Sequence, residues 1–131
     1  MFELTINENV YQFNFGMGFL RKIDPIVTKP LEDGIKGKVQ NLGLRYAVGA
    51  LIDNDPEMLV DVLLIANEGN TPRLTKKDIE SHIENENTDL EALFEDVLGF
   101  LKTANVTKKT TQTMLEAVEA EQAKAAAHQS E

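Results

Sequence analysis

The chain has 131 residues, no cysteine and a formal net charge of −9, and its 42% hydrophobic and 27% charged residues are ordinary for a globular protein. A chain of this length forms one domain with a hydrophobic core, and without cysteine it has neither a disulfide framework nor thiolate chemistry. The N-terminus lacks the basic and apolar segments of a signal peptide, and the longest strictly apolar run, residues 62–66, is too short to span a membrane.

The first fifteen residues predict a β-hairpin. Phe2, Leu4 and Ile6 alternate with polar residues, and residues 7–9 form a polar turn. A second run carries four residues assigned to its apolar face: Val10, Tyr11, Phe13 and Phe15. The pattern predicts strands near residues 2–6 and 10–15 with one buried face. Because a two-stranded hairpin is marginally stable alone in water, it must pack on the helices that follow.

A short helix is predicted after the hairpin. Apolar residues at helical spacing extend from Gly18 to Val27, and Asp24-Pro25 shortens or kinks the helix. Residues 28–38 contain one proline and two glycines, which predicts a loop and makes this segment the best candidate for disorder within the domain.

The next helix is expected to start at Val39. Leu42 and Tyr46 would lie on its buried face, and Gly43 and Gly49 would allow close contact between helices. This helix should end at residues 53–56.

The strongest start signal in the chain belongs to the following helix. Asp55 suits the N-cap and Pro56 suits the first helical position, while Gly69 suits the residue after the C-cap. Residues 75–78 have the spacing of a capping box for a short helix, with Asp78 in the place of Glu or Gln.

The clearest amphipathic helix spans about residues 90–101. Residues 88–91, Thr-Asp-Leu-Glu, form a capping box at its start. Its apolar residues then recur at spacings of three and four: Leu90, Leu93, Phe94, Val97, Leu98 and Leu101.

Residues 107–131 are expected to form a C-terminal extension beyond a domain of residues 1–106. The segment is polar and then alanine-rich, so it favours helix but buries little, and we expect it to be partly helical or disordered. Its small apolar face, Met114, Leu115 and Val118, is the candidate partner-binding site, because a partner could order the segment. Removal of the residues after Lys109 should then leave the melting temperature nearly unchanged.

The predicted fold class is therefore α+β: an N-terminal antiparallel β-hairpin packed on a mostly α-helical domain of about five helices. The predicted core has twelve members: Phe13, Phe15, Leu20, Ile23, Leu42, Tyr46, Leu59, Leu63, Leu93, Phe94, Val97 and Leu101.

Charge is unevenly distributed along the chain. Residues 53–99 hold thirteen acidic and three basic residues, a local charge of −10. Such a surface repels phosphate, so nucleic-acid binding is not expected. The acidic residues are interpreted either as a solvated helical face or as a surface complementary to a basic partner.

No motif indicates catalysis, a metal or a cofactor. Residues 16–18 resemble the start of a dinucleotide fingerprint, but Arg21 occupies its sixth position and the preceding strand belongs to an antiparallel hairpin. Residues 53–64 lack the glycine and glutamate of a calcium loop. His82, Glu84 and Glu86 are two residues apart and do not converge on a helix. We therefore expect a binding or assembly protein without a cofactor rather than an enzyme.

Four segments together resemble the tail assembly chaperones of long-tailed, siphovirus-type bacteriophages that infect Gram-positive bacteria. They are FELTINENVYQFNFGMGFLRKI, GLRYAVGALIDNDPEMLVDVLLIAN, PRLTKKDIESHIE and TDLEALFEDVLGFLKTANVTKKT. The resemblance covers about residues 1–115 and depends on the order and extent of the segments rather than on a chemical motif.

The resemblance implies a non-enzymatic role in tail morphogenesis. Such chaperones coat the long, hydrophobic tape-measure protein, keep it soluble, and help to recruit tail-tube subunits. They act in the host cytoplasm and are absent from the mature virion. In this family a ribosomal frameshift often gives a longer form that shares the N-terminal domain. The coating role, with the unpaired edge of the hairpin, also predicts self-association.

Two other functions stay open from the sequence. One is a small ligand-binding domain or enzyme with a pocket between the hairpin and the helices. The other is a structural protein retained in the virion.

Overall fold

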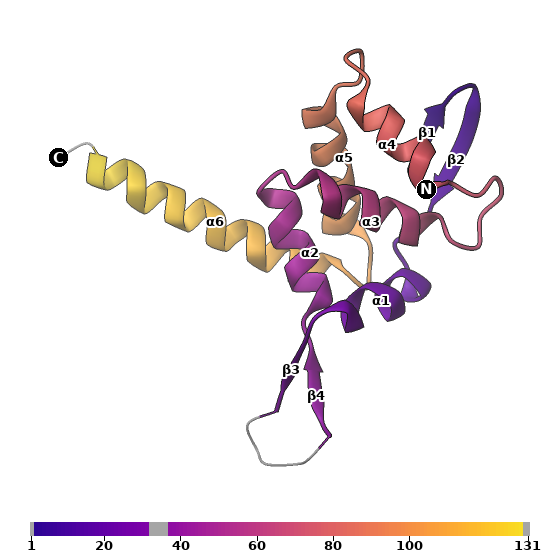
Figure 1. The fold of residues 1–131 in the computed structure, drawn as a ribbon. Coiled ribbons are helices and arrows are strands. Elements are labelled where there is room, and N and C mark those ends of the chain that lie inside the picture. The colour runs from indigo at the N-terminus through magenta and orange to yellow at the C-terminus, as the bar shows by residue number, and fades with distance from the viewer. Residues whose placement is uncertain (1, 32–36, 130–131) are drawn as a thin grey trace.

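The computed structural model describes residues 2–31 and 37–129, which form an α+β fold with an N-terminal antiparallel hairpin and six α-helices (Figure 1). The hairpin and α1 to α5 gather around a common core, while α6 leaves this body and extends away from it (Figure 1). The predicted fold class is therefore confirmed. Within the described residues, no helix combines the length and apolar character that a membrane crossing requires.

The N-terminal hairpin pairs β1 (Phe2–Ile6) with β2 (Asn9–Phe13), and Phe2 lies opposite Phe13. The two turn residues, Asn7 and Glu8, have φ values of 51° and 70°. Positive φ at both central residues is the geometry of a type I′ turn, whose twist matches that of the paired strands.

One face of this hairpin is buried, as predicted, but Val10 does not belong to it. Tyr11, Phe13 and Phe15 are buried, whereas Val10 is 45% exposed. Side chains alternate strictly along a strand, so Val10 must lie on the face opposite Tyr11.

The first helix is short, as predicted. α1 (Met17–Ile23) passes directly into a single 3₁₀ turn, η1 (Asp24–Ile26), which contains Pro25. The proline removes a main-chain donor from the helical ladder and ends the α-helix there.

A second hairpin follows where the sequence predicted a loop over residues 28–38 and a helix from Val39. β3 (Thr28–Pro30) pairs with β4 (Val39–Asn41). All six strand residues are exposed, so no apolar alternation marked these strands in the sequence. The predicted disorder concerns a segment that includes residues 32–36, which lie outside the described residues.

The next two helices are α2 (Gly43–Ile52) and α3 (Pro56–Asn67). The buried face of α2 contains Leu44, Ala47, Val48 and Leu51. Tyr46 was assigned to the core but is 58% exposed, because the helix is turned so that its neighbour Ala47 points inward.

The start of α2 is held tightly against the end of α1. A Cβ atom on Gly43 would overlap the main-chain oxygen of Ile23 and lie 2.6 Å from that of Asp24. The Asp24 carboxylate also accepts a hydrogen bond from the main-chain N–H of Leu44 at 3.2 Å. Glycine is therefore required at position 43 by close approach, as the sequence predicted for helix contact.

The caps of the later helices largely follow the sequence. Asp55 caps α3 by accepting from the N–H of Glu57 at 3.0 Å, and Gly69 follows the C-cap with a φ of 85°. Thr75 caps α4 (Lys76–Glu84) by accepting from the N–H of Asp78 at 3.2 Å.

The cap of α5 (Leu90–Thr103) lies one residue later than predicted. The N-cap is Asp89, whose carboxylate accepts from the N–H of Ala92 at 3.0 Å, and Thr88 lies outside the helix. Asp and Thr are both favoured at the N-cap. Because Thr88 and Asp89 are adjacent, the sequence does not decide which of them caps the helix.

The helix α3 lies at the centre of the body, in contact with β2, α1, α2 and α4. Nine predicted core residues are buried: Phe13, Phe15, Ile23, Leu59, Leu63, Leu93, Phe94, Val97 and Leu101. Leu20 and Leu42 are only partly buried, and Leu42 precedes α2 instead of lying on its inner face.

A buried asparagine at the end of α3 ties three segments together. The Asn67 amide donates to the main-chain oxygens of Gln12 at 3.1 Å and Pro72 at 3.3 Å. Its side-chain oxygen accepts from the N–H of Leu74 at 2.6 Å. Because Asn67 is fully buried, these hydrogen bonds replace all the water that its amide would otherwise contact.

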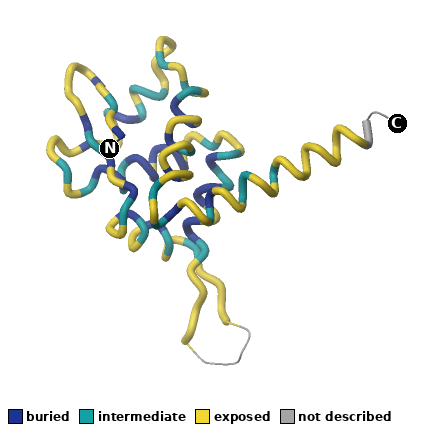
Figure 2. The backbone as a smooth tube through the Cα atoms, turned by 180° about the vertical axis from the view of Figure 1, so that it is seen from behind, coloured by how far each residue is buried: buried dark blue, intermediate teal, exposed yellow. Residues whose placement is uncertain are grey.

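The last helix, α6 (Lys108–Gln129), begins within the packed body and ends outside it. Thr107 and Thr111 are fully buried, and their hydroxyls donate to the main-chain oxygens of Leu101 at 2.7 Å and Thr107 at 2.9 Å. These bonds and the contacts of α6 with α2 and α5 fix the direction of its first turns. By contrast, residues 119–127 are all exposed (Figure 2).

Candidate functional site

The apolar residues predicted to bind a partner, Met114, Leu115 and Val118, lie on α6 where it leaves the body. All three are partly buried, and Met114 packs against the core. The terminal methyl of Met114 lies 3.4 Å from the position that a Cβ on Gly49 would occupy. Met114 therefore serves partly to dock α6 on α2, and Leu115 and Val118 lie at the transition to the exposed half of the helix.

A shallow depression of about 360 Å³ lies on α2 beside this junction, lined by Tyr46, Gly49 and Ala50 with acidic and basic neighbours. Tyr46 is the most exposed large apolar residue among those described. Tyr46 was predicted to lie in the core, so its exposure at the surface was not expected from the sequence. Tyrosine is enriched at protein-binding surfaces.

The β3–β4 hairpin projects from the body at the end opposite to α4 (Figure 1). Three apolar residues at or near it are exposed: Ile26 at 48%, Leu31 at 38% and Val39 at 52%. Each described sheet contains two strands, so no third strand pairs with either hairpin there, although the main-chain oxygen of Gln12 on β2 already accepts from Asn67. The sequence did not predict the β3–β4 hairpin, because the proline and glycines of residues 28–38 are typical of a loop.

An aromatic cluster joins the N-terminal hairpin to α5. The ring of Phe2 lies 5.0 Å from that of Phe100 and 5.4 Å from that of Phe13, measured between centroids. Phe15 and Phe19 continue the cluster at 5.2 Å. Phe100 is 37% exposed, so the cluster reaches the surface at this residue.

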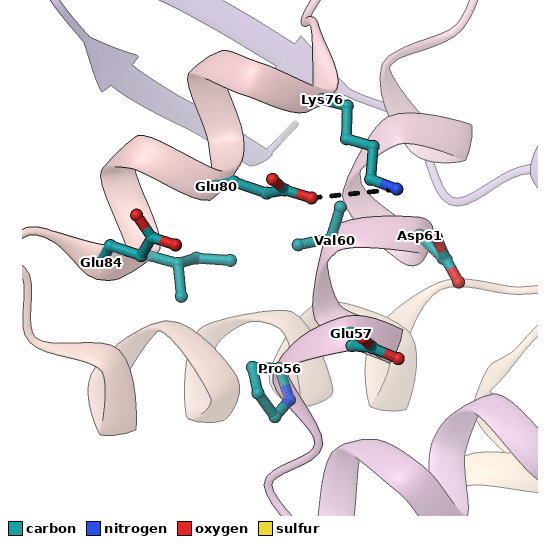
Figure 3. A pocket seen from close by; sticks show the side chains of 8 residues that line it. Pro56, Glu57, Val60, Asp61, Lys76, Glu80 and Glu84 are labelled. Atoms are coloured by element: carbon teal, nitrogen blue, oxygen red, sulfur yellow. Dashed lines mark ion pairs between the residues drawn. The ribbon is translucent and has the colours of Figure 1, made fainter.

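An open groove of about 510 Å³ separates α3 from α4. Glu57 and Asp61 on α3 and Glu80 and Glu84 on α4 supply four carboxylates to its lining (Figure 3). Its apolar part is contributed by three side chains: Pro56, Val60 and Ile83. One base lines the groove, Lys76, whose Nζ lies 3.9 Å from a carboxylate oxygen of Glu80.

The depression nearest to the predicted ligand pocket lies between β2, α1 and the end of α3, with a volume of about 310 Å³. Lys22 and Glu68 both line it and form an ion pair with one another. Glu68 also lies 3.4 Å from the guanidinium of Arg73. The acid in this depression is thus already paired with bases from two segments.

Among the described residues, no three His, Asp or Glu side chains come together in a way that could hold a metal ion. His82 is partly buried on α4, and this burial lowers its pKa below the ordinary value of 6.5 because a charged imidazole loses hydration there. The geometry thus offers surfaces for protein contacts, of which the groove and the start of the exposed part of α6 are the best defined.

Comparison with known proteins adds one match. A family model described as "Phage tail assembly chaperone protein, TAC" matches residues 3–116. This range includes the N-terminal hairpin except Phe2, the second hairpin, the first five helices and the packed start of α6. No curated protein and no solved structure shows a match to the chain.

Proposed function

The chain belongs to the phage tail assembly chaperone family, and from that premise we propose that it binds the tape-measure protein and keeps it soluble during tail assembly. The observation that carries this proposal is the extent of the family match, which spans residues 3–116 and thus nearly the whole packed body. In this role the chain acts by binding rather than by catalysis and needs no cofactor.

The form of α6 supports the proposal. Its start is anchored by buried threonines, and its outer half presents exposed residues to any partner. Leu115 and Val118, at the junction between the two halves, would contact apolar side chains of a helical client, and Met114 would support them. A client that is long, helical and hydrophobic needs such contacts repeated along its length, because its apolar surface would otherwise associate with other copies.

A second part of the proposal concerns other partners. Tail-tube subunits would be recruited to the coated tape-measure protein, and a longer frameshifted form of this chain would share the same packed body. Copies of the chain would associate along the client, and the exposed β3–β4 hairpin, with which no third strand pairs in the described residues, offers main-chain groups for such contacts. Head-to-tail contacts would suit an open row of copies better than a closed pair.

The place of action follows from this role. The protein would act in the cytoplasm of a bacterial host, which the resemblance suggests to be Gram-positive, and would leave before the particle is complete. Mass spectrometry of purified virions tests this point. Stoichiometric amounts of the chain in the virion would instead indicate a structural protein.

The central test is co-expression of the chain with the tape-measure protein of the same phage. We expect the tape-measure protein to be insoluble alone, and soluble and co-purified when the chain is present. A tape-measure protein that stays insoluble with the chain present, at equal expression, would refute the proposal.

A further inference from the structure

We propose that the groove between α3 and α4 is a docking site for a basic amphipathic segment of a protein partner, one that carries lysine or arginine on both sides of an apolar stripe. The inference rests on the proposed function in one respect, namely that the chain holds a protein client. It adds where a second contact is made and what chemistry the client segment must have.

The two sides of the groove have the same construction. Glu57 and Asp61 are four residues apart on α3, and Glu80 and Glu84 are four residues apart on α4, so each pair lies along one face of its helix. Figure 3 shows the two acidic pairs coming from different helices, with Val60 between them. The groove is therefore an apolar floor bordered by carboxylates on two sides.

Within the described residues, few basic side chains neutralise these four carboxylates. Glu80 has one basic neighbour, Lys76, at 3.9 Å, whereas Glu57, Asp61 and Glu84 belong to none of the ion pairs in the described part of the chain. Like charges four residues apart weaken a helix, and Glu84 stands in the last turn of α4, where the helix dipole disfavours an anion. A bound cationic segment would remove both penalties.

The floor of the groove indicates which residues the partner segment needs beside its basic ones. Val60 is only 7% exposed, and Ile83 packs partly against the core, so the floor is apolar and firmly held. A simple cation would leave this floor uncovered. A segment with apolar residues at helical spacing and basic residues beside them would cover the floor and pair with both acidic sides at once.

Charge complementarity selects this occupant over an acidic or neutral one. Residues 53–99 carry a local charge of −10, which attracts a basic partner over distances of about one Debye length, roughly 10 Å at 0.1 M salt. Arginine would be favoured at the groove because its guanidinium can pair with a carboxylate through two parallel hydrogen bonds.

The chain offers a matched control for the acidic side on α3. Glu57 and Asp61 are the second and sixth residues of α3, and Glu91 and Glu95 are the second and sixth residues of α5. All four are exposed, but Glu91 and Glu95 do not line the groove. The double variants E57Q/D61N and E91Q/E95Q therefore remove the same charge from equivalent helix positions and differ in location.

The first experiment measures binding of a leucine–lysine amphipathic peptide of about 18 residues, long enough to form a helix, by fluorescence anisotropy. For two solvent-accessible charge contacts we expect E57Q/D61N to weaken binding about tenfold and E91Q/E95Q to weaken it less than about twofold. Ile83→Thr should weaken binding without changing its dependence on salt. A leucine–glutamate peptide of the same pattern should not bind. Melting temperatures of all variants establish that each one is folded.

Equal losses in the two double variants would overturn the proposal, because they would show that the peptide follows the overall negative charge. An absence of loss in E57Q/D61N would overturn it too, because the groove would then make no contact. The same variants in the co-expression test separate this inference from the proposed function. If the wild-type chain does not hold the tape-measure protein, the proposed function fails. If wild type and E57Q/D61N hold it equally well, only the groove inference fails.

Discussion

The amide of Asn67 donates a hydrogen bond to the main-chain oxygen of Gln12 at 3.1 Å, which fastens the end of the central helix to the N-terminal hairpin. The same side chain accepts from the N–H of Leu74 at 2.6 Å and so holds the start of the segment that leads into α4. One buried side chain thus determines how the hairpin, α3 and the following segment fit together.

Replacement of Asn67 by alanine should strongly destabilise the protein. The change leaves the N–H of Leu74 and two main-chain oxygens without their partner in a buried place, at a cost of about 3 kcal/mol. For a domain of this size that corresponds to a Tm lower by about 10 °C in thermal unfolding. Asn87→Ala, at an exposed asparagine, is the control and should change Tm little. Equal effects of the two changes would contradict the role assigned to Asn67.

Two glycine replacements should have opposite effects. Gly43→Ala should destabilise by about 2 kcal/mol or more, because the new methyl group overlaps main-chain atoms that cannot move independently of α1. Gly99→Ala should stabilise by about 1 kcal/mol, because this position lies inside α5 with open space around it. Urea denaturation of both variants measures the two free energies of unfolding. An unchanged or raised stability of Gly43→Ala would show that the contact at Gly43 is not tight, and a destabilised Gly99→Ala would show that position 99 is not open.

Truncation within α6 should reveal where its packed part ends. The sequence alone predicted that removal of the residues after Lys109 leaves Tm nearly unchanged. Since Thr111 is fully buried and Met114 packs against the core, we now expect this truncation to lower Tm clearly. Truncation after Val118 should change Tm by less than about 2 °C, because residues 119–127 are all exposed. Thermal unfolding of the two truncated chains distinguishes these outcomes.

His82 should make stability depend on pH below about 6.5. Burial lowers its pKa in the folded chain, so the unfolded chain binds the proton more readily once the pH falls below the unfolded pKa. The stability that the neutral ring contributes is therefore complete when the pH is above the pKa of His82 in the unfolded chain. It is lost as the pH falls from there through the lower pKa of His82 in the folded chain. His82→Gln should reduce the fall in Tm between pH 7.5 and 5.5. An unchanged pH profile in that variant would show that other groups are responsible.

The apolar residues at the junction of α6 should be needed for the client but not for folding. Leu115→Ser together with Val118→Ser should lower the amount of tape-measure protein kept soluble on co-expression, with a change in Tm of less than about 3 °C. Ala117→Ser, at an exposed position of the same helix turn, is the control. Loss of client binding accompanied by unfolding of the variant, or no loss at all, would contradict this assignment.

Local signals in the sequence were sufficient for much of the fold. The hairpin at residues 2–13 and the caps at Asp55 and Thr75 depend on neighbouring residues alone, and all were predicted. The rotation of α2 was not predicted. Its buried residues Leu44, Ala47, Val48 and Leu51 recur at spacings of three and four, but the helix was expected to start at Val39 with Leu42 and Tyr46 on its inner face. The β3–β4 hairpin was missed because a strand with no buried face carries no apolar alternation.

The candidate site was harder to predict than the fold. The acidic character of residues 53–99 was visible in the sequence, with a basic partner as one interpretation. Yet Glu57 and Glu84 are far apart along the chain, and only the packing of α4 against α3 brings them to one groove. Asn67 gave no signal either, since a single asparagine near a helix end is usually an exposed cap.

Because the start of α6 is anchored, the rotational orientation of its outer half about the helix axis is fixed relative to the body. Since each helical residue advances about 1.5 Å and turns about 100°, the direction in which any following residue points is set by counting from Thr111. Insertion of about seven residues would carry the end of the helix roughly 10 Å further with nearly the same azimuth. Insertion of two would swing it to the opposite side, so a partner bound there would have to meet the body from another direction.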